Sequence, residues 1–329
     1  MNVAFAALGM WMLAATPALS TGFERVMVPD PGGPPLEAGI WYPSTAPATS
    51  QTLGLYRQTV AVGGAVVGRD LPVIVMSHGA GGSFEGHYDT ALALAEAGFV
   101  VAAVTHTGDN YRDQSQFGHF DSRPPHIKAL IDYMLASWPH HAALDASRIG
   151  AFGFSAGGFT TLVLIGGTPD MTLTGPYCAA HPDEWGCRKV RERKIDRSAP
   201  VPAANWVHDP RIAAAVIAAP AAGYAFLPKG LADVRVPIQL WRGDSDEIVP
   251  HPNYAQAVYD RLPTKPEYHV VPNAGHFAFL APCTPAFERI VPEGCRDPAG
   301  FDRAAFHQEF NSAVVAFFKG KLPSSPARL

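Results

Sequence analysis

The feature that most constrains the fold of this sequence is the stretch Gly153–Gly157, which reads G-F-S-A-G, together with its two flanks. Residues 146–153 read as a buried strand, and residues 159–165 read as a buried helix that ends at Gly166 and Gly167. A serine held between glycines at a sharp strand-to-helix turn projects its hydroxyl clear of the backbone. The setting therefore predicts that Ser155 is a nucleophile. A glycine- and serine-rich loop without chemistry is the alternative, because the pattern alone also arises by chance.

Apolar runs and helical patterns alternate along the rest of the chain. We expect strands at 24–29, 37–43, 71–77, 99–104, 146–153, 211–218, 236–241 and 268–271, with helices at 87–97, 124–138, 159–165 and 301–319. Residues 44–70 are expected to be a loop-rich connection. Strands that alternate with helices are typical of α/β proteins with a mostly parallel, doubly wound sheet. Residues 21–329 are therefore predicted to form one α/β domain.

Composition narrows the possible partners. Hydrophobic residues make up 47% of the 329 residues and charged residues only 16%, which is typical of a globular protein with long buried strands. The formal net charge is −4, so we expect no nucleic-acid partner. Oligomeric state has no signature in the sequence.

Residues 1–20 resemble a secretory signal peptide. They hold an apolar run from Val3 to Ala15, followed by Ala18-x-Ser20, which fits a small-x-small cleavage site. The run is short for a membrane span, so no stable membrane insertion is expected. No Lys or Arg precedes Arg25, however, and a hydrophobic N-terminal anchor is the alternative. We predict a secreted or periplasmic protein.

The four cysteines fit an oxidising compartment. Cys178 and Cys187 lie nine positions apart, and Cys283 and Cys295 lie twelve apart, both in loop-like sequence. Of the three possible connectivities, local pairing within each couple is the simplest. A zinc site is the rival reading, but these spacings do not match C-x₂-C pairs. Disulfides are predicted, and no metal site.

Residues 168–210 interrupt the alternation of strands and helices. A segment this long carries structure or function of its own, so we expect a cap held by the disulfide Cys178–Cys187. Its charged cluster, residues 188–197, is interpreted as a solvated helix face. Its aromatic residues either contact substrate or form the core of the cap.

A serine nucleophile needs a histidine base and a carboxylate to orient that base. Two turn-rich loops follow predicted strands in the required order, residues 242–250 and residues 272–277. The second loop contains His276, and the first offers both Asp244 and Asp246. Because ligands bind at the carboxyl ends of the strands in open α/β sheets, both loops are expected at the site.

Both of these loops and a third segment, residues 77–83, resemble segments of the α/β-hydrolase family. The run from Gly243 through Asp246 to Pro250 is similar to the acid loop of that family, and residues 273–276 (N-A-G-H) are similar to its histidine loop. The match implies that Asp246, rather than Asp244, is the triad acid. Residues 77–83 (S-H-G-A-G-G-S) resemble the family's oxyanion loop, which implies that Ala80 donates its backbone N–H. Ala156, next to the nucleophile, is expected to supply the second donor.

The wider sequence sharpens the resemblance. Residues 77–83 and 95–106 together are similar to the dienelactone hydrolase-like group, which includes plasma-type platelet-activating-factor acetylhydrolases. Dienelactone hydrolases proper use a cysteine nucleophile, whereas this chain has Ser155. The resemblance therefore implies a serine esterase.

The expected function is that of a serine carboxylic-ester hydrolase that works through Ser155, His276 and Asp246 without a metal or organic cofactor. Its substrate would be a small-molecule or lipid-like ester, or a polyester. The same triad serves an amidase or a lactonase, and a non-catalytic binding protein on this fold is the third possibility. The side chains proposed to contact substrate are Phe154, His106, Tyr177, Trp185 and Trp206.

Overall fold

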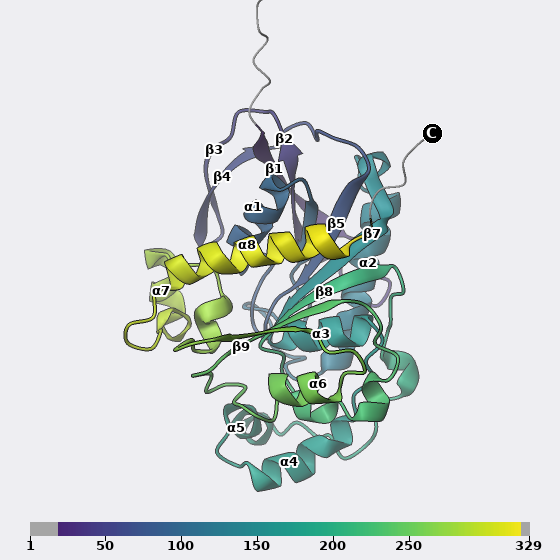
Figure 1. The fold of residues 1–329 in the computed structure, drawn as a ribbon, viewed down its shortest axis with the longest axis vertical. Coiled ribbons are helices and arrows are strands. Elements are labelled where there is room, and N and C mark those ends of the chain that lie inside the picture. The colour runs from purple at the N-terminus through teal and green to yellow at the C-terminus, as the bar shows by residue number, and fades with distance from the viewer. Residues whose placement is uncertain (1–18, 324–329) are drawn as a thin grey trace, which may run out of the picture.

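A ten-stranded sheet runs through the centre of the computed structural model, which describes residues 19–323 (Figure 1). The strand order is β10-β9-β8-β7-β5-β6-β2-β1-β4-β3. The strands are β1 (Ser20–Val28), β2 (Leu36–Ser44), β3 (Thr49–Leu53), β4 (Tyr56–Val62), β5 (Leu71–Ser77), β6 (Val100–Val104), β7 (Leu144–Phe154), β8 (Ile212–Ala218), β9 (Ile238–Gly243) and β10 (Glu267–Val271). Residues 1–18 of the predicted signal peptide lie outside the described residues.

The first six strands in this order, from β10 to β6 and including β5, pair in parallel throughout. Strand β2 pairs antiparallel with β6. The helices are α1 (Tyr88–Glu96), α2 (Arg123–Ala136), α3 (Ala156–Leu164), α4 (Thr174–Ala180), α5 (Trp185–Glu192), α6 (Ala255–Arg261), α7 (Pro285–Ile290) and α8 (Arg303–Lys321). The expected doubly wound, mostly parallel α/β sheet is confirmed.

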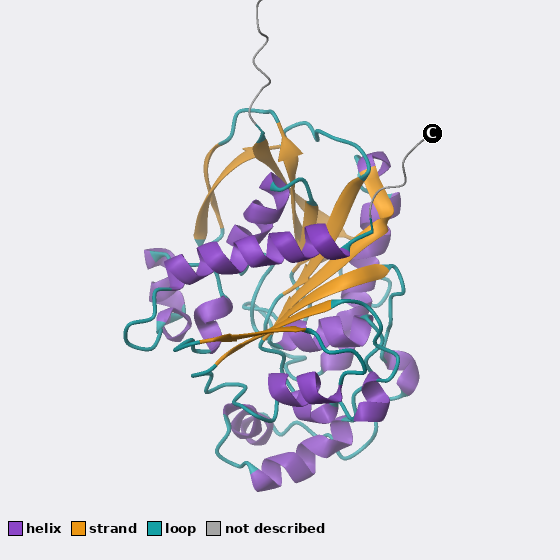
Figure 2. Ribbon diagram, viewed as in Figure 1, coloured by secondary structure: helices purple, strands orange, loops and turns teal. Residues whose placement is uncertain are grey.

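Helices cover both faces of the sheet (Figure 2). Along β5, Val73 and Val75 join the core beneath α2, α3 and α6, whereas Ile74 and Met76 join the core beneath α1 and α8. Successive side chains of a strand point to opposite faces, so a strand that is buried on both faces must be apolar throughout. This is why the central strands read as unbroken apolar runs.

The prediction of a loop-rich connection over residues 44–70 is wrong. Strands β3 and β4 form an antiparallel hairpin there, joined by a turn at Gly54, which has a φ of +55°. In β4, the buried side chains of Tyr56, Gln58 and Val60 alternate with exposed ones. That period of two is the ordinary sign of a strand with one buried face, and the polar residues of β3 hid it.

The segment of residues 168–210 folds as two short helices, α4 and α5, connected by irregular chain and 3₁₀ turns. We call it the cap segment. It lies at the end of the molecule opposite the β3–β4 hairpin (Figure 1). The disulfide Cys178–Cys187 joins α4 to α5, and a second disulfide joins Cys283 to Cys295. Both local pairings agree with the prediction.

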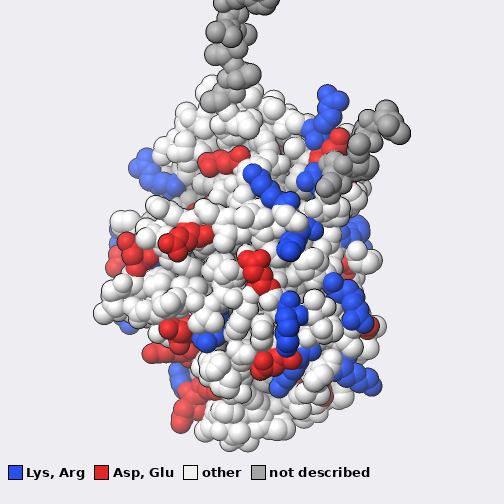
Figure 3. Space-filling model, viewed as in Figure 1, with Lys and Arg blue, Asp and Glu red and all other residues white. Residues whose placement is uncertain are grey.

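Charged side chains of both signs are interspersed over the face drawn in Figure 3. Among residues 19–323, none of the helices combines the length and the apolar character needed to cross a bilayer.

Candidate functional site

Ser155 occupies the sharp turn between β7 and α3 and has a φ of +55°, a conformation that residues other than glycine rarely adopt. The two glycines of the pattern are required by close backbone contacts. A Cβ atom on Gly153 would lie 2.1 Å from the carbonyl oxygen of Gly157, and one on Gly157 would lie 1.8 Å from the carbonyl oxygen of Ser77. Glycine at the first and last positions of the pattern is therefore a steric requirement of this turn.

Ser155, His276 and Asp246 form a continuous hydrogen-bonded chain. The Oγ of Ser155 lies 3.0 Å from Nε2 of His276, and Nδ1 of His276 lies 2.8 Å from Oδ2 of Asp246. All three residues are buried. Since the carboxylate of Asp246 accepts from Nδ1, the neutral ring carries its proton there and Nε2 is free to accept the serine hydroxyl. This is the geometry that proton abstraction from a serine requires.

The carboxylate of Asp246 is itself held in place. Its second oxygen, Oδ1, accepts hydrogen bonds from the backbone N–H groups of Ile248 and Val249, both at 2.9 Å. Asp244, the competing candidate, is exposed and accepts a hydrogen bond from Ser245. Only Asp246 of the two aspartates therefore reaches the histidine.

Neighbouring strand ends bring these loops together. Ser77, the last residue of β5, is in register with Gly153 of β7, so the loop of residues 77–83 starts beside the serine turn. Gly243 of β9 is in register with Val271 of β10, and the N–H of Ser245 donates to the carbonyl of Ala274. The acid loop and the histidine loop are thus tied to each other at the same edge of the sheet.

Ala80 and Ala156, the two proposed oxyanion donors, line the same cavity as Ser155. Within residues 19–323, the backbone N–H of neither residue has a hydrogen-bond acceptor. Ala156 is the first residue of α3, where the N–H groups of a helix point outward and carry partial positive charge. Both residues therefore line the cavity with backbone N–H groups that have no acceptor among the described residues.

A buried polar cluster supports the loop of residues 77–83. Arg123 is fully buried, pairs with Asp109 at 3.1 Å and donates to the carbonyl of His78. Asp109 in turn accepts from the N–H of Gly81 at 3.0 Å.

The N–H of His106 donates to Nε2 of His78, so the other ring nitrogen of His78 donates to the Gly79 carbonyl. Burial, aided by the Arg123 cation, holds the pKa of His78 and of His106 well below the ordinary value, so both stay neutral.

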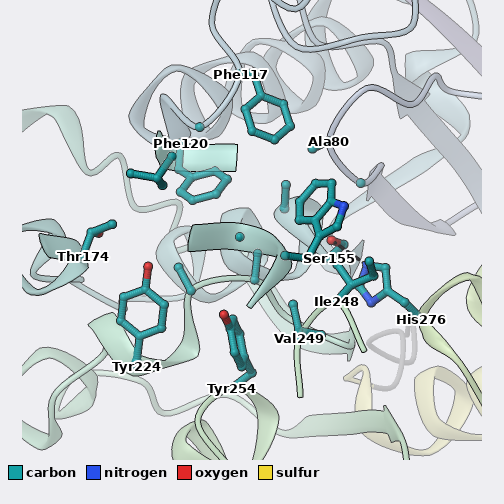
Figure 4. A pocket seen from close by; sticks show the side chains of 18 of the residues that line it. Ala80, Phe117, Phe120, Ser155, Thr174, Tyr224, Ile248, Val249, Tyr254 and His276 are labelled. Atoms are coloured by element: carbon teal, nitrogen blue, oxygen red, sulfur yellow. Dashed lines mark hydrogen bonds between the residues drawn. The ribbon is translucent and has the colours of Figure 1, made fainter. Parts of the chain in front are cut away.

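A cavity of about 160 Å³ opens over Ser155, and its walls are mostly apolar. Figure 4 shows Ser155 and His276 side by side, with Tyr224, Tyr254 and Phe120 across the cavity from them. The cap segment contributes to its walls Met171, Thr174, Trp185, Gly186, Val190, Ile195 and Arg197. The cavity is therefore shared between the strand ends and the cap segment.

Of the five side chains expected to contact substrate, Phe154 and Trp185 line this cavity. The other three do not. His106 is fully buried behind the loop of residues 77–83, where its Nε2 bonds Ser77 Oγ at 2.8 Å. Trp206 packs in the core against Phe159. Tyr177 stacks on Tyr224, with ring centroids 3.8 Å apart, and donates to Glu184.

Several cavity residues were not anticipated from the sequence. Phe117 and Phe120 come from the loop before α2, Tyr224 follows β8, Ile248 belongs to the acid loop, and Tyr254 precedes α6. Ile248 could have been found, because it lies two residues after Asp246. The others come from loops with no motif, and only the folded chain brings them together.

Within the described part of the chain, no group of three or more His, Cys, Asp or Glu side chains is arranged to hold a metal ion.

One known protein family matches part of the chain. Residues 47–119 match the sequence profile of the family described as "Platelet-activating factor acetylhydrolase, isoform II". This stretch includes the loop of residues 77–83, so the resemblance expected from the sequence is confirmed there. It ends before Ser155.

Two curated relatives each align with 56% of the chain. Cutinase est1 of Thermobifida alba is 27% identical over 189 residues, and Cutinase 2 of Thermobifida cellulosilytica is 28% identical over 189 residues. The matches cover 46% and 52% of the relatives, so the chain spans about half the length of each.

Solved structures match over nearly the whole chain. A ferulic acid esterase from Streptomyces cinnamoneus aligns with a TM-score of 0.62 at 20% identity, covering 97% of this chain and 95% of its own. A protein from Agrobacterium tumefaciens, described as a putative alpha/beta hydrolase, aligns with a TM-score of 0.51 at 14% identity, covering 92% of this chain and all of its own. At these identities the likeness concerns the fold.

Proposed function

We propose that the chain, which shares the α/β-hydrolase fold of these solved structures, is a serine carboxylic-ester hydrolase of the α/β-hydrolase superfamily with Ser155 as nucleophile. One observation carries the proposal, namely the chain of hydrogen bonds from Ser155 Oγ through His276 to Asp246, at 3.0 and 2.8 Å. The names of the solved esterase and of the two curated cutinases point to the same class of reaction.

In the proposed mechanism, His276 Nε2 takes the proton of Ser155 as Oγ attacks the ester carbonyl. The carbonyl oxygen becomes an oxyanion, which the N–H groups of Ala80 and Ala156 stabilise. His276 then protonates the leaving alcohol, and an acyl-Ser155 intermediate remains. A water molecule, deprotonated by His276, attacks this acyl group and releases the acid. Asp246 keeps the ring oriented and stabilises the imidazolium in each step.

The size and cover of the cavity bear on the substrate class. Trp185, Val190 and Ile195 of the cap segment stand over a mostly apolar space of about 160 Å³. A space bounded in this way favours a small ester with an apolar or aromatic part over a polymer chain. We propose that the cap segment bounds the substrate site.

Localisation is part of the same proposal. Structural disulfides form and persist mainly in oxidising compartments, so Cys178–Cys187 and Cys283–Cys295 support a secreted or periplasmic protein. Among the described residues, all cysteines are paired.

The nucleophile is tested with Ser155→Ala, using Ser147→Ala as a matched control on the exposed start of the same strand. Ser155→Ala should lower kcat for 4-nitrophenyl butyrate at least about 10⁴-fold, whereas Ser147→Ala should retain it. A fluorophosphonate probe should label Ser155 of the wild-type protein, as located by peptide mass spectrometry. Full activity of Ser155→Ala, or a wild-type protein without any esterase activity, would refute the proposal.

A further inference from the structure

Arg197 is the only Lys, Arg, Asp or Glu among the described residues that line the cavity over Ser155. It follows α5 in the cap segment and is half-buried. The surrounding walls, among them Phe117, Phe120 and Tyr224, are apolar or carry neutral polar groups. The sequence places Arg197 at the end of a charged run that is otherwise mostly exposed, so its position in the cavity emerges only from the fold.

The guanidinium of Arg197 has unused hydrogen-bonding capacity. It donates to the carbonyl oxygen of Gly118. Among residues 19–323, Asp121 and Asp196 act on it through their charges, without a hydrogen bond or a salt bridge. Asp121 accepts a hydrogen bond from Asn205 at 3.3 Å. A guanidinium has five donors in a planar fork that suits a carboxylate, and one backbone carbonyl satisfies only part of them.

The surface beside the cavity carries two further cations. A second hollow shares Phe117 and Ile195 with the cavity, and its remaining lining includes Arg193 and Lys194. Asp196 is the only carboxylate among its described lining residues. Cations that line a concave approach raise the local concentration of anions. Both hollows therefore favour an anionic group on the same side of the cavity.

We propose that Arg197 is a specificity-determining residue, which binds a carboxylate carried by the substrate at the end remote from the scissile ester. The substrate class is then that of half-esters of dicarboxylic acids, or esters of alcohols and phenols that bear a carboxylate. The apolar walls would contact the part of the substrate between its two polar ends. This inference rests on the proposed esterase function.

The test compares substrates that differ only in that charge. One pair is the mono-4-nitrophenyl ester of adipic acid and the 4-nitrophenyl ester of its monoamide, which places the carboxylate on the acyl side. The second pair is 4-carboxyphenyl acetate and 4-carbamoylphenyl acetate, which places it on the leaving group. Each rate is divided by the rate with hydroxide, so that the intrinsic reactivity of the ester cancels.

The wild-type protein should prefer the carboxylate in at least one pair by about tenfold or more in kcat/KM, the effect of one charge-assisted hydrogen bond. Arg197→Gln should remove this preference by slowing only the charged member, and Arg197→Lys should keep part of it. Arg191→Gln is the matched control, because Arg191 is an exposed cation of α5 outside the cavity lining. It should retain the wild-type preference.

Two results would overturn the inference. The first is an absence of preference in both pairs for the wild-type protein. The second is an equal loss on both members of a pair in Arg197→Gln, which would mean that Arg197 only ties the cap segment to Gly118. If Arg197→Gln does not fold, as judged by thermal unfolding, the wild-type ratio and Arg197→Lys decide. If no ester is hydrolysed at all, the proposed function fails, and this inference fails with it.

Discussion

The strand ends and the cap segment both line the cavity over Ser155, yet they are held in different ways. The strand ends position Ser155 through backbone contacts so close that Gly153 and Gly157 admit no side chain. One disulfide links the two helices of the cap segment to each other, and backbone hydrogen bonds anchor the segment near its ends, at Thr168 and Asp209. Between these anchors it is held by side-chain contacts, such as the hydrogen bond that Tyr254 donates to Glu184 at 2.9 Å.

This difference suggests that the strand ends fix the catalytic geometry, whereas the cap segment sets the substrate preference. Catalytic geometry tolerates displacements of only a fraction of an ångström, and a packed sheet edge provides that precision. The middle of the cap segment, which is held by side-chain contacts, can change its lining residues without displacing Ser155. We therefore expect substitutions at the strand ends to abolish activity or folding, and substitutions in the cap segment to alter substrate preference.

The largest contrast is expected between two glycines. In Gly157→Ala the new Cβ would meet the Ser77 carbonyl oxygen at 1.8 Å, whereas at Gly175 of α4 a Cβ would meet nothing within 4 Å. Gly157→Ala should lose more than about 4 kcal/mol of unfolding free energy or fail to fold. Gly175→Ala should keep wild-type stability and activity, since alanine favours a helix. Urea unfolding measures both, and a stable Gly157→Ala protein would contradict the close packing of α3 on β5.

The second contrast lies within the acid loop. Asp246→Asn should lower kcat about 10⁴-fold, because an amide at that position favours the wrong tautomer of His276. Asp244→Asn should change kcat less than about twofold, since its side chain is exposed. Ester hydrolysis at saturating substrate measures both values. Similar losses in the two variants would show that the loop acts as a whole rather than through Asp246.

Acid should weaken the sheet edge through its buried histidines. Burial lowers the pKa of His87, which packs on Phe152 and Phe154, to about 4. The unfolded chain binds this proton at about pH 6.5, so it holds more protons than the folded chain between pH 6.5 and 4. Unfolding free energy should therefore fall as the pH drops through this window, by about 3 kcal/mol for His87 alone.

The variant His87→Phe should show a shallower pH dependence of stability, measured by urea unfolding at several pH values. His208→Phe, at an exposed histidine of the cap segment, should keep the wild-type slope. An unchanged slope in His87→Phe would mean that other groups cause the acid sensitivity.

The smallest expected effect concerns the cap disulfide. Closing the short loop between Cys178 and Cys187 contributes about 2–3 kcal/mol by chain entropy. In the double variant Cys178→Ser, Cys187→Ser, hydrogen exchange should accelerate in α4 and α5 and stay unchanged in β7. KM should rise more than kcat falls. Equal loss of protection in β7 would show that the cap segment and the sheet unfold as one unit.

Local sequence was sufficient wherever a short-range rule applied. The apolar runs of the central strands reflect burial on both faces, and the G-F-S-A-G turn follows from the steric limits at its two glycines. The β3–β4 hairpin was missed because β3 is polar and largely exposed. The expectation that His106 would contact substrate did not anticipate the buried cluster of Arg123 and His78, which holds it behind the loop.

The sequence by itself determined that Ser155 sits on a strand-to-helix turn and that Asp246 and His276 follow in the required order, because strand patterns and glycine positions are local properties. Only the tertiary structure decided which side chains share the cavity. Phe117, Tyr224 and Arg197 lie far apart in the chain, and their meeting depends on how the cap segment packs over the sheet edge. Packing of this kind is a long-range property that no short pattern in the sequence records.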